Sequence, residues 1–214
     1  MNPNSMLYWW PVLSQLGNVV PMPRTILIKV RNPTKLYSVL DGHKLPDGLL
    51  ESIVTTADGV GGFPIFLRGD LTSGKHSYVE TCHVADMGTL GAHLYRLIEE
   101  SVLGPGDVPA AFAVRQLLDL NAPFRAFKGL PIAAERRYFV RDGEVLCHHP
   151  YWPKDAIKFW NGTGPIRWKR DLDLINREKS DEVTLLTSYA KALSLRLERH
   201  WSVDFAQDRL GKWW

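Results

Sequence analysis

The sequence predicts an α+β fold, because stretches with helical periodicity and stretches with strand character both occur along its 214 residues. The clearest helix is 181–199, which has apolar residues on one side, acids at its start and arginines at its end. The clearest buried strand is the β-branched apolar run 25–30. An Asp-Gly turn at 142–143 joins two further strands in a hairpin, so an antiparallel sheet is expected.

The remaining elements follow from apolar spacing and from residues that start or stop helices. Helices are expected at 7–16, between the capping Asn32 and Gly42, at 47–56 and at 86–103. Strands are expected at 63–68, 77–82, 110–118, 124–127, 135–140, 144–148 and 201–206. Another strand is expected to start at 212–214, so we expect the chain to be truncated within its last strand.

Composition excludes several classes of protein. Hydrophobic residues make up 45% of the chain and Gly and Pro show no period, which excludes disorder, collagen and coiled coil. No apolar run is long enough to span a membrane and no signal peptide is visible, so we expect a cytoplasmic protein. Cys82 and Cys147 lack a disulfide or metal spacing and are expected to be reduced. The net charge of +3 is too small to indicate nucleic-acid binding.

The stretch 63–76 combines a strand that ends in Arg68 with a loop that contains Gly74 and Lys75. Two cations and small residues in this order can bind a polyphosphate, because backbone N–H groups approach an anion closely at such residues. The loop is not a Walker A motif, since His76 replaces the Ser or Thr that follows the lysine. The alternative is a solvated hairpin loop with a lysine at its tip.

Two other strands carry charged residues on one face. Side chains alternate along a strand, so Glu135, Arg137 and Phe139 are expected to share a face. That arrangement is either a surface ion pair or an arginine directed at phosphate and held by a carboxylate. In 201–206, Asp204 lies opposite the apolar side chains and is either a strand-end cap or a magnesium ligand.

Other chemistries lack support. The adjacent His148 and His149 point to opposite sides of a strand and cannot chelate one zinc ion, and no other zinc spacing accompanies them. The GxSxG, HExxH and strand-associated GxGxxG motifs are all absent. The segment 151–170 interleaves aromatic residues with cations, so it either binds single-stranded nucleic acid or packs as an aromatic loop over a sheet.

Taken in order, these motifs resemble those of an ATP-grasp domain over nearly the whole chain. The features that carry the resemblance are the entry 16–25 (LGNVVPMPRT), the strand 63–68 (FPIFLR) before a Gly/Lys loop, the segment 113–118 (AVRQLL), the strand 135–140 (ERRYFV) and the late strand 202–205 (SVDF). The sequence is most similar to small ATP-grasp proteins of phages and bacteria, in which an arginine replaces the first of two phosphate-binding lysines.

The resemblance implies two α+β lobes with antiparallel sheets that enclose a nucleotide cleft, here 1–108 and 109–214. By this resemblance Arg68 and the flap residue Lys75 contact the ATP phosphates, and Arg137 contacts the γ-phosphate or acyl phosphate, beside Glu135. Lys75 and Arg137 are the implied catalytic residues. The adenine-side hinge is implied to consist of Arg115, Gln116, Leu117 and Leu118, and Asp204 is implied to bind Mg²⁺.

The implied activity is ATP-dependent ligation of a carboxylate to an amine or thiol through an acyl phosphate, with ATP and Mg²⁺ as cofactors. If the protein is phage-encoded, its location is the host cytoplasm. The second metal-binding motif of the family, an acid followed two residues later by Asn or an acid, does not occur after 212. A nucleotide-binding module without ligase chemistry is therefore the alternative, and nucleic-acid binding is a third.

Overall fold

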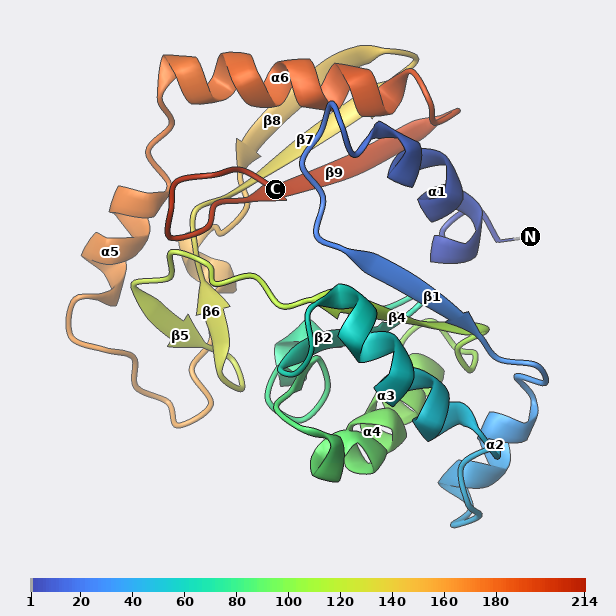
Figure 1. Cartoon of the computed structure of the whole chain (residues 1–214). Coiled ribbons are helices and arrows are strands. Elements are labelled where there is room, and N and C mark those ends of the chain that lie inside the picture. Colours follow the sequence, from blue (N-terminus) through green and yellow to red (C-terminus); the bar gives the residue numbers. More distant parts are fainter. Residues whose placement is uncertain (1) are drawn as a thin grey trace. The chain divides into compact units, whose positions relative to one another are not determined.

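Residues 2–214 are described by a computed structural model, and their contacts divide the chain into two units (Figure 1). Unit 1 contains the N-terminal residues up to Tyr8 together with Pro23–Leu117 and Lys128–Leu130. Unit 2 contains Trp9–Met22, Leu118–Phe127 and Pro131–Trp214. Both units combine helices with antiparallel sheet, as the α+β class predicts.

The sheet of unit 1 has four antiparallel strands in the order β1-β4-β2-β3. Their bounds are Thr25–Lys29 (β1), Ala111–Gln116 (β4), Ile65–Gly69 (β2) and His83–Val84 (β3). Because β4 pairs with both β1 and β2, it belongs to unit 1, whereas the expected division after residue 108 would separate it from its own sheet.

Helices cover one face of this sheet: α2 (Lys35–Leu40), α3 (Leu49–Val60) and α4 (Leu90–Leu103). The expected apolar stripe of α4 is confirmed, because Leu90, Leu94, Leu97 and Ile98 are all buried in this core. The expected start of α4 at residue 86 is four residues too early. A short 3₁₀ helix, Met87–Thr89, comes first, and the carboxylate of Asp86 caps it by accepting from Thr89 N.

Unit 2 is built on a three-stranded antiparallel sheet in the order β8-β7-β9. The strands are β7 (Glu135–Arg141), β8 (Glu144–Pro150) and β9 (His200–Ala206), and β7 and β8 form the expected hairpin. Helix α6 (Ser180–Ser194) lies along one face of the sheet, as Figure 1 shows. Alternate residues of β7 and β9, such as Tyr138 and Phe205, pack in the core beneath α6.

The other elements are short. They are α1 (Met6–Leu13), α5 (Trp168–Ile175), the strand pair β5 (Phe124–Ala126) and β6 (Leu130–Ile132), and 3₁₀ helices at Ser14–Leu16, Lys75–Ser77 and Lys154–Ala156. Helix α5 was not expected, since its sequence belongs partly to the segment 151–170 in which no period was visible.

The expected strand at 77–82 is wrong. The chain forms the 3₁₀ helix Lys75–Ser77 and a turn there, and only His83 and Val84 pair with β2. The physical reason is a local side-chain hydrogen bond, because Thr81 Oγ1 lies 2.7 Å from the carbonyl oxygen of Gly74 and 2.9 Å from that of Ser77. These bonds close the segment into a turn and compete with strand pairing.

The last residues fold back on β9. The N–H and carbonyl groups of Trp214 both bond to Ala206 at 3.0 Å, and Trp213 forms a bridge with Gln207. The carboxylate of Asp208 closes the intervening turn by accepting hydrogen bonds from Leu210 N, Lys212 N and Trp214 Nε1. The strand expected to begin at 212 thus appears as a short antiparallel pairing with the end of β9.

Candidate functional site

Arg137 and Asp204 form the central polar contact on the face of the unit 2 sheet opposite α6. They lie directly opposite each other on β7 and β9. Arg137 Nε donates to Asp204 Oδ1 at 2.7 Å, and Nη2 donates to Oδ2 at 2.8 Å. This bidentate bond raises the pKa of Arg137 further above its ordinary value, so the guanidinium is permanently charged.

Two aromatic residues complete this face. The guanidinium carbon of Arg137 lies 4.4 Å from the centre of the Tyr151 ring. Glu135, on the same face, accepts a hydrogen bond of 2.8 Å from Trp152 Nε1. The predicted shared face of Glu135 and Arg137 therefore agrees with the strand register, and a carboxylate that pairs with the arginine is that of Asp204. Sequence reasoning missed Tyr151, which no spacing rule connects to β7.

Arg136, the neighbour of Arg137, points to the opposite face and is buried. Its Nε donates to Glu182 Oε1 at 2.6 Å, and its Nη atoms donate to the carbonyl oxygens of Glu135, Ile175 and Arg177 at 3.0 Å. These bonds join β7 to α6 and to the end of α5. Arg136 is therefore a structural residue, and two adjacent arginines have different roles because strand side chains alternate.

In unit 1, Arg68 and Arg115 lie on the sheet face opposite the helices. Arg115 is paired with Phe66 in the register, and Arg68 is two residues beyond Phe66 on β2, so the two guanidinium groups share a face. Arg115 Nε donates to Thr25 Oγ1 at 3.1 Å, and Arg68 Nε donates to the carbonyl oxygen of Gly69 at 3.0 Å. Among residues 2–214, neither arginine forms an ion pair with a carboxylate.

Burial without a counter-ion makes this pair electrostatically unfavourable. Burial lowers the pKa of Arg115 to about 10, and the positive charge of Arg68 lowers it further. Burial also lowers the pKa of Arg68, although Cys82 and Asp70 oppose that change. Both groups remain charged at neutral pH, so the face has a positive charge that an anion would offset.

Lys75 is the first residue of the 3₁₀ helix that follows Gly74. Gly74 has a φ of +61°, and a Cβ there would lie 2.9 Å from Glu100 Oε2, so a glycine is required. Asp70, earlier in the same loop, is buried and accepts hydrogen bonds from Ser5 Oγ and Ala110 N. The loop is thus a folded turn rather than the simple hairpin of the alternative interpretation, and the role of Lys75 stays a prediction.

The segment 115–118, expected beside adenine, is where the chain leaves unit 1. Gln116 closes the sheet, because its N–H donates to the carbonyl oxygen of Arg24 and its Oε1 accepts from Arg24 N at 3.4 Å. Unit 1 ends at Leu117 and unit 2 continues at Leu118, and both side chains are half-buried. The structure places Arg115 on the face shared with Arg68, which favours an anion as its partner.

The arrangement around Asp204 does not fit a metal site. Both carboxylate oxygens accept hydrogen bonds from Arg137. Within residues 2–214, no group of three or more His, Cys, Asp or Glu side chains could hold a metal ion. Mg²⁺ prefers several oxygen ligands in near-octahedral geometry, and one engaged carboxylate does not supply them. The predicted metal role of Asp204 remains a prediction.

The aromatic residues of 151–170 pack largely on one another. Phe159 lies 5.3 Å from Trp168 and 6.3 Å from Phe124, measured between ring centres, and Trp152 is buried. Only Trp160 among the aromatic residues of this segment is strongly exposed, at 73%. Stacking platforms for nucleic-acid bases need exposed rings. Packing within unit 2 therefore explains this segment better than nucleic-acid binding. In the same described residues, no helix is long and apolar enough to cross a membrane.

A family model for an ATP-grasp domain, the third family of its clade, matches residues 47–214. The chain belongs to this family. The match includes both sheets and the residues Arg68, Arg115, Arg137 and Asp204, so it confirms the resemblance inferred from the motifs. No curated protein matches the chain.

Solved structures show the same fold at low sequence identity. Cdc123 from Schizosaccharomyces pombe has a TM-score of 0.58 and 12% identity, with 98% of this chain and 80% of that chain covered. The biotin carboxylase domain of Hydrogenobacter thermophilus 2-oxoglutarate carboxylase, solved with MgADP, has a TM-score of 0.52 and 12% identity, with coverages of 99% and 38%. N5-carboxyaminoimidazole synthase from Aspergillus clavatus, solved with ADP, has a TM-score of 0.50 and 12% identity, with coverages of 98% and 42%. The chain also spans half the length of the ATP-grasp ligase PsnB.

Proposed function

We propose that this ATP-grasp protein is an ATP-dependent ligase that joins a carboxylate to an amine or thiol through an acyl phosphate. The observation that carries the proposal is the family match, which includes the cationic faces of both sheets. Phosphoryl transfer from ATP to a carboxylate concentrates negative charge on the transferred group. Fixed cations directed at that charge stabilise the transition state, and this electrostatic contribution is usually the largest.

Arg68 and Arg115 are the proposed phosphate contacts of unit 1. They share one sheet face, and no carboxylate among the described residues neutralises them. A nucleotide phosphate would remove the like-charge repulsion and restore hydrogen bonds to two partly dehydrated guanidinium groups. Lys75, which follows the constrained Gly74, is proposed as a third cation for the phosphates.

Arg137 is the proposed contact of unit 2 to the transferred phosphoryl group. The pair with Asp204 uses its Nε and Nη2 atoms, so Nη1 lies outside that ion pair. Tyr151 supports the guanidinium from one side. A charge held in place by strand pairing and by a bidentate bond need not reorganise during the reaction, which is the condition for efficient electrostatic catalysis. Glu135 is proposed to maintain this face through Trp152.

Magnesium is proposed to accompany ATP as the nucleotide's own counter-ion. Structures of the same fold were solved with MgADP, whereas the residues described here assemble no metal site. A thermal-shift series with ATP, ADP and GTP, each with and without Mg²⁺, tests this directly. A ligand that binds only the folded protein raises its melting temperature. We expect the largest shift with ATP and Mg²⁺ together.

Ligase activity is tested by measuring ADP and phosphate release in the presence of mixed amino acids and short peptides. We expect Arg137→Ala to lower turnover about 100-fold, a loss typical of removing one transition-state contact. Arg141→Ala is the matched control, because Arg141 lies on the same strand, is exposed and forms an ion pair with its neighbour Asp142. Equal turnover by the two variants would contradict the role of Arg137.

A nucleotide-binding module without ligase chemistry is the second candidate. It is favoured by the engaged carboxylate of Asp204 and by the lack of an acid cluster within residues 2–214. The two functions differ in one result. A module would show the ATP-dependent thermal shift with no phosphate release for any acceptor, whereas a ligase would release phosphate with its own acceptor only.

A further inference from the structure

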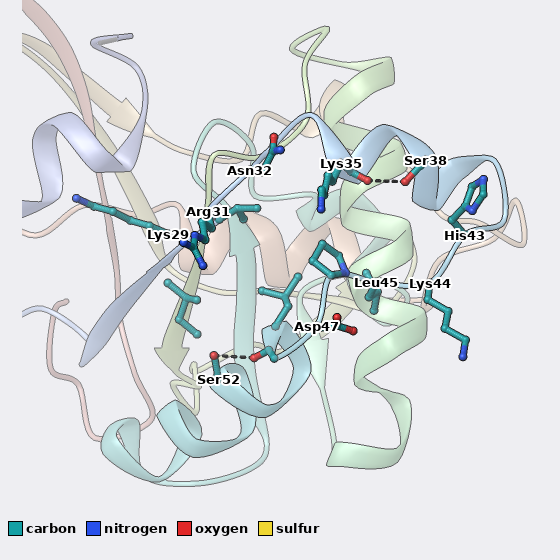
Figure 2. Close-up of a pocket in the computed structure, with 15 residues that line it drawn as sticks. Lys29, Arg31, Asn32, Lys35, Ser38, His43, Lys44, Leu45, Asp47 and Ser52 are labelled. Atoms are coloured by element: carbon teal, nitrogen blue, oxygen red, sulfur yellow. Dashed lines mark hydrogen bonds between the residues drawn. The ribbon is translucent and has the colours of Figure 1, made fainter.

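A hollow of about 750 Å³ lies in unit 1, away from the face that carries Arg68 and Arg115 (Figure 2). It is formed where β1 ends and where the chain leads into α2 and then into α3. Its apolar lining comes from residues that belong to the core or pack against it, namely Ile28, Val30, Leu45 and Leu49. The hollow therefore has an apolar floor and lies within one unit.

Cations surround the hollow. Its lining includes four of them but one acid, Asp47; the cations are Lys29, Arg31, Lys35 and Lys44. In Figure 2 the side chains of Lys29 and Lys44 extend outward on opposite sides, and those of Arg31 and Lys35 lie between them. All four are exposed, and none has an ion pair among the described residues. This row of positive charge suits an elongated anion better than a single point charge.

The hollow adjoins an open sheet edge. β1 is an edge strand, since its only strand partner in the described chain is β4. Val30 N donates to Ala110 O and Arg24 O accepts from Gln116 N, so the even-numbered residues direct their backbone groups at β4. The backbone groups of Thr25, Leu27 and Lys29 therefore point away from the sheet. An unpaired edge of this kind is a template for another extended chain.

We propose that this surface binds an acidic peptide segment in extended conformation, which adds to β1 and places carboxylates on the row of cations. Backbone hydrogen bonds to the outward groups of β1 would provide affinity. Alternate side chains of the added strand would reach the hollow, where the cations select acids and the floor accepts apolar groups.

Two features favour a peptide over a nucleic acid. The hollow is lined by no Phe, Tyr or Trp side chain among residues 28–52, so it offers no aromatic ring on which a base could stack. Its apolar floor and the neighbouring strand edge match groups that a peptide has and a phosphodiester backbone lacks. The proposal does not depend on the ligase function, because binding to unit 1 is measured without nucleotide.

Fluorescence anisotropy with a labelled ten-residue peptide of alternating Glu and Val tests the proposal on the full chain. Three further probes separate the contributions. A Gln/Val peptide removes the charge, and two N-methylated Glu/Val peptides, each modified at one alternate set of residues, remove the strand hydrogen bonds. Single-stranded DNA tests the nucleic-acid alternative. We expect the Glu/Val peptide to bind, at least one N-methylated form to bind about tenfold more weakly, and higher salt to weaken binding.

The protein variant is Arg31→Glu combined with Lys35→Glu, which reverses the two cations in the middle of the row. We expect a loss of about tenfold or more in affinity for the Glu/Val peptide. The control is Arg96→Glu combined with Lys191→Glu, which changes the net charge equally at exposed ion pairs elsewhere. Melting curves establish that each variant is folded.

Each of three outcomes overturns the proposal. One is equal peptide binding by the variant and its control, which indicates non-specific attraction to charge. Another is tighter binding of single-stranded DNA than of the Glu/Val peptide. The third is no binding of the Glu/Val peptide to the folded wild-type protein at millimolar concentration.

Discussion

Arg137 on β7 and Asp204 on β9 face each other in the sheet register and form a bidentate ion pair of 2.7 and 2.8 Å. The pair links two residues that are 67 positions apart in the chain. Because the strands fix both backbones, little side-chain entropy remains to be lost when a substrate binds. The carboxylate expected to bind a metal here holds a proposed catalytic cation in place.

The first prediction concerns Asp204→Asn. We expect it to change the unfolding free energy by less than about 1 kcal/mol, because both partners are about one-third exposed and solvent weakens such pairs. We expect ATP turnover to fall about tenfold, since Arg137 would lose its fixed orientation. Chemical denaturation and a phosphate-release assay measure the two effects. Unchanged turnover would show that Arg137 needs no such support.

The second prediction concerns Arg115→Met. Removing one of two like charges that are partly dehydrated should stabilise the free protein, and the melting temperature should rise by about 2–4 °C. The same change should weaken ATP binding about tenfold, measured by titration calorimetry. The opposite signs distinguish a binding residue from a structural one. A fall in the melting temperature without nucleotide would contradict this interpretation.

The pH dependence of that stabilisation also follows. The pKa of Arg115 in the folded protein, about 10, lies below its ordinary value, so the unfolded chain binds more protons only above about pH 10. Below that pH the group is charged in both states, and the cost of its burial is constant. We therefore expect the same shift in melting temperature for Arg115→Met at about pH 6 and about pH 8.

The third prediction concerns Arg136→Met, which removes the buried cation between β7 and α6. Glu182 and three backbone carbonyl groups would lose their donor, so we expect a loss of about 3–5 kcal/mol in unfolding free energy. Arg137→Met is the matched control on the adjacent residue, with an expected loss below about 1 kcal/mol. Urea titration distinguishes the two values. Similar losses would show that Arg136 is not the structural member of the pair.

The fourth prediction compares Gly74→Ala with Gly42→Ala. Both glycines have positive φ, at +61° and +88°, so both substitutions introduce backbone strain. At Gly42 an added Cβ meets nothing within 4 Å, whereas at Gly74 it approaches Glu100 Oε2 at 2.9 Å and Leu97 Cδ2 at 3.1 Å. We expect about 1 kcal/mol of destabilisation at Gly42 and more at Gly74, by thermal melting. A smaller loss at Gly74 would mean that its loop moves freely.

Several elements could be predicted from sequence because their causes are local. The stripe of α4, the hairpin of β7 and β8, and the alternation that separates Arg136 from Arg137 depend on spacing within a few residues. The strand expected at 77–82 could not be excluded in this way. Its competitor was a hydrogen bond from Thr81 Oγ1 to Gly74, seven residues earlier, and no periodicity reveals it.

The sequence alone determined the order of motifs, the residue types that point to phosphate chemistry, and the alternation that places Glu135, Arg137 and Asp204 on polar faces. Only the tertiary structure decided their partners. It joined Arg137 to Asp204, placed Arg115 beside Arg68 without a counter-ion, and left the outer edge of β1 unpaired by another strand of the described chain. The reason is that alternation is a property of one strand, whereas ion pairs and open edges depend on which distant strands are hydrogen-bonded together.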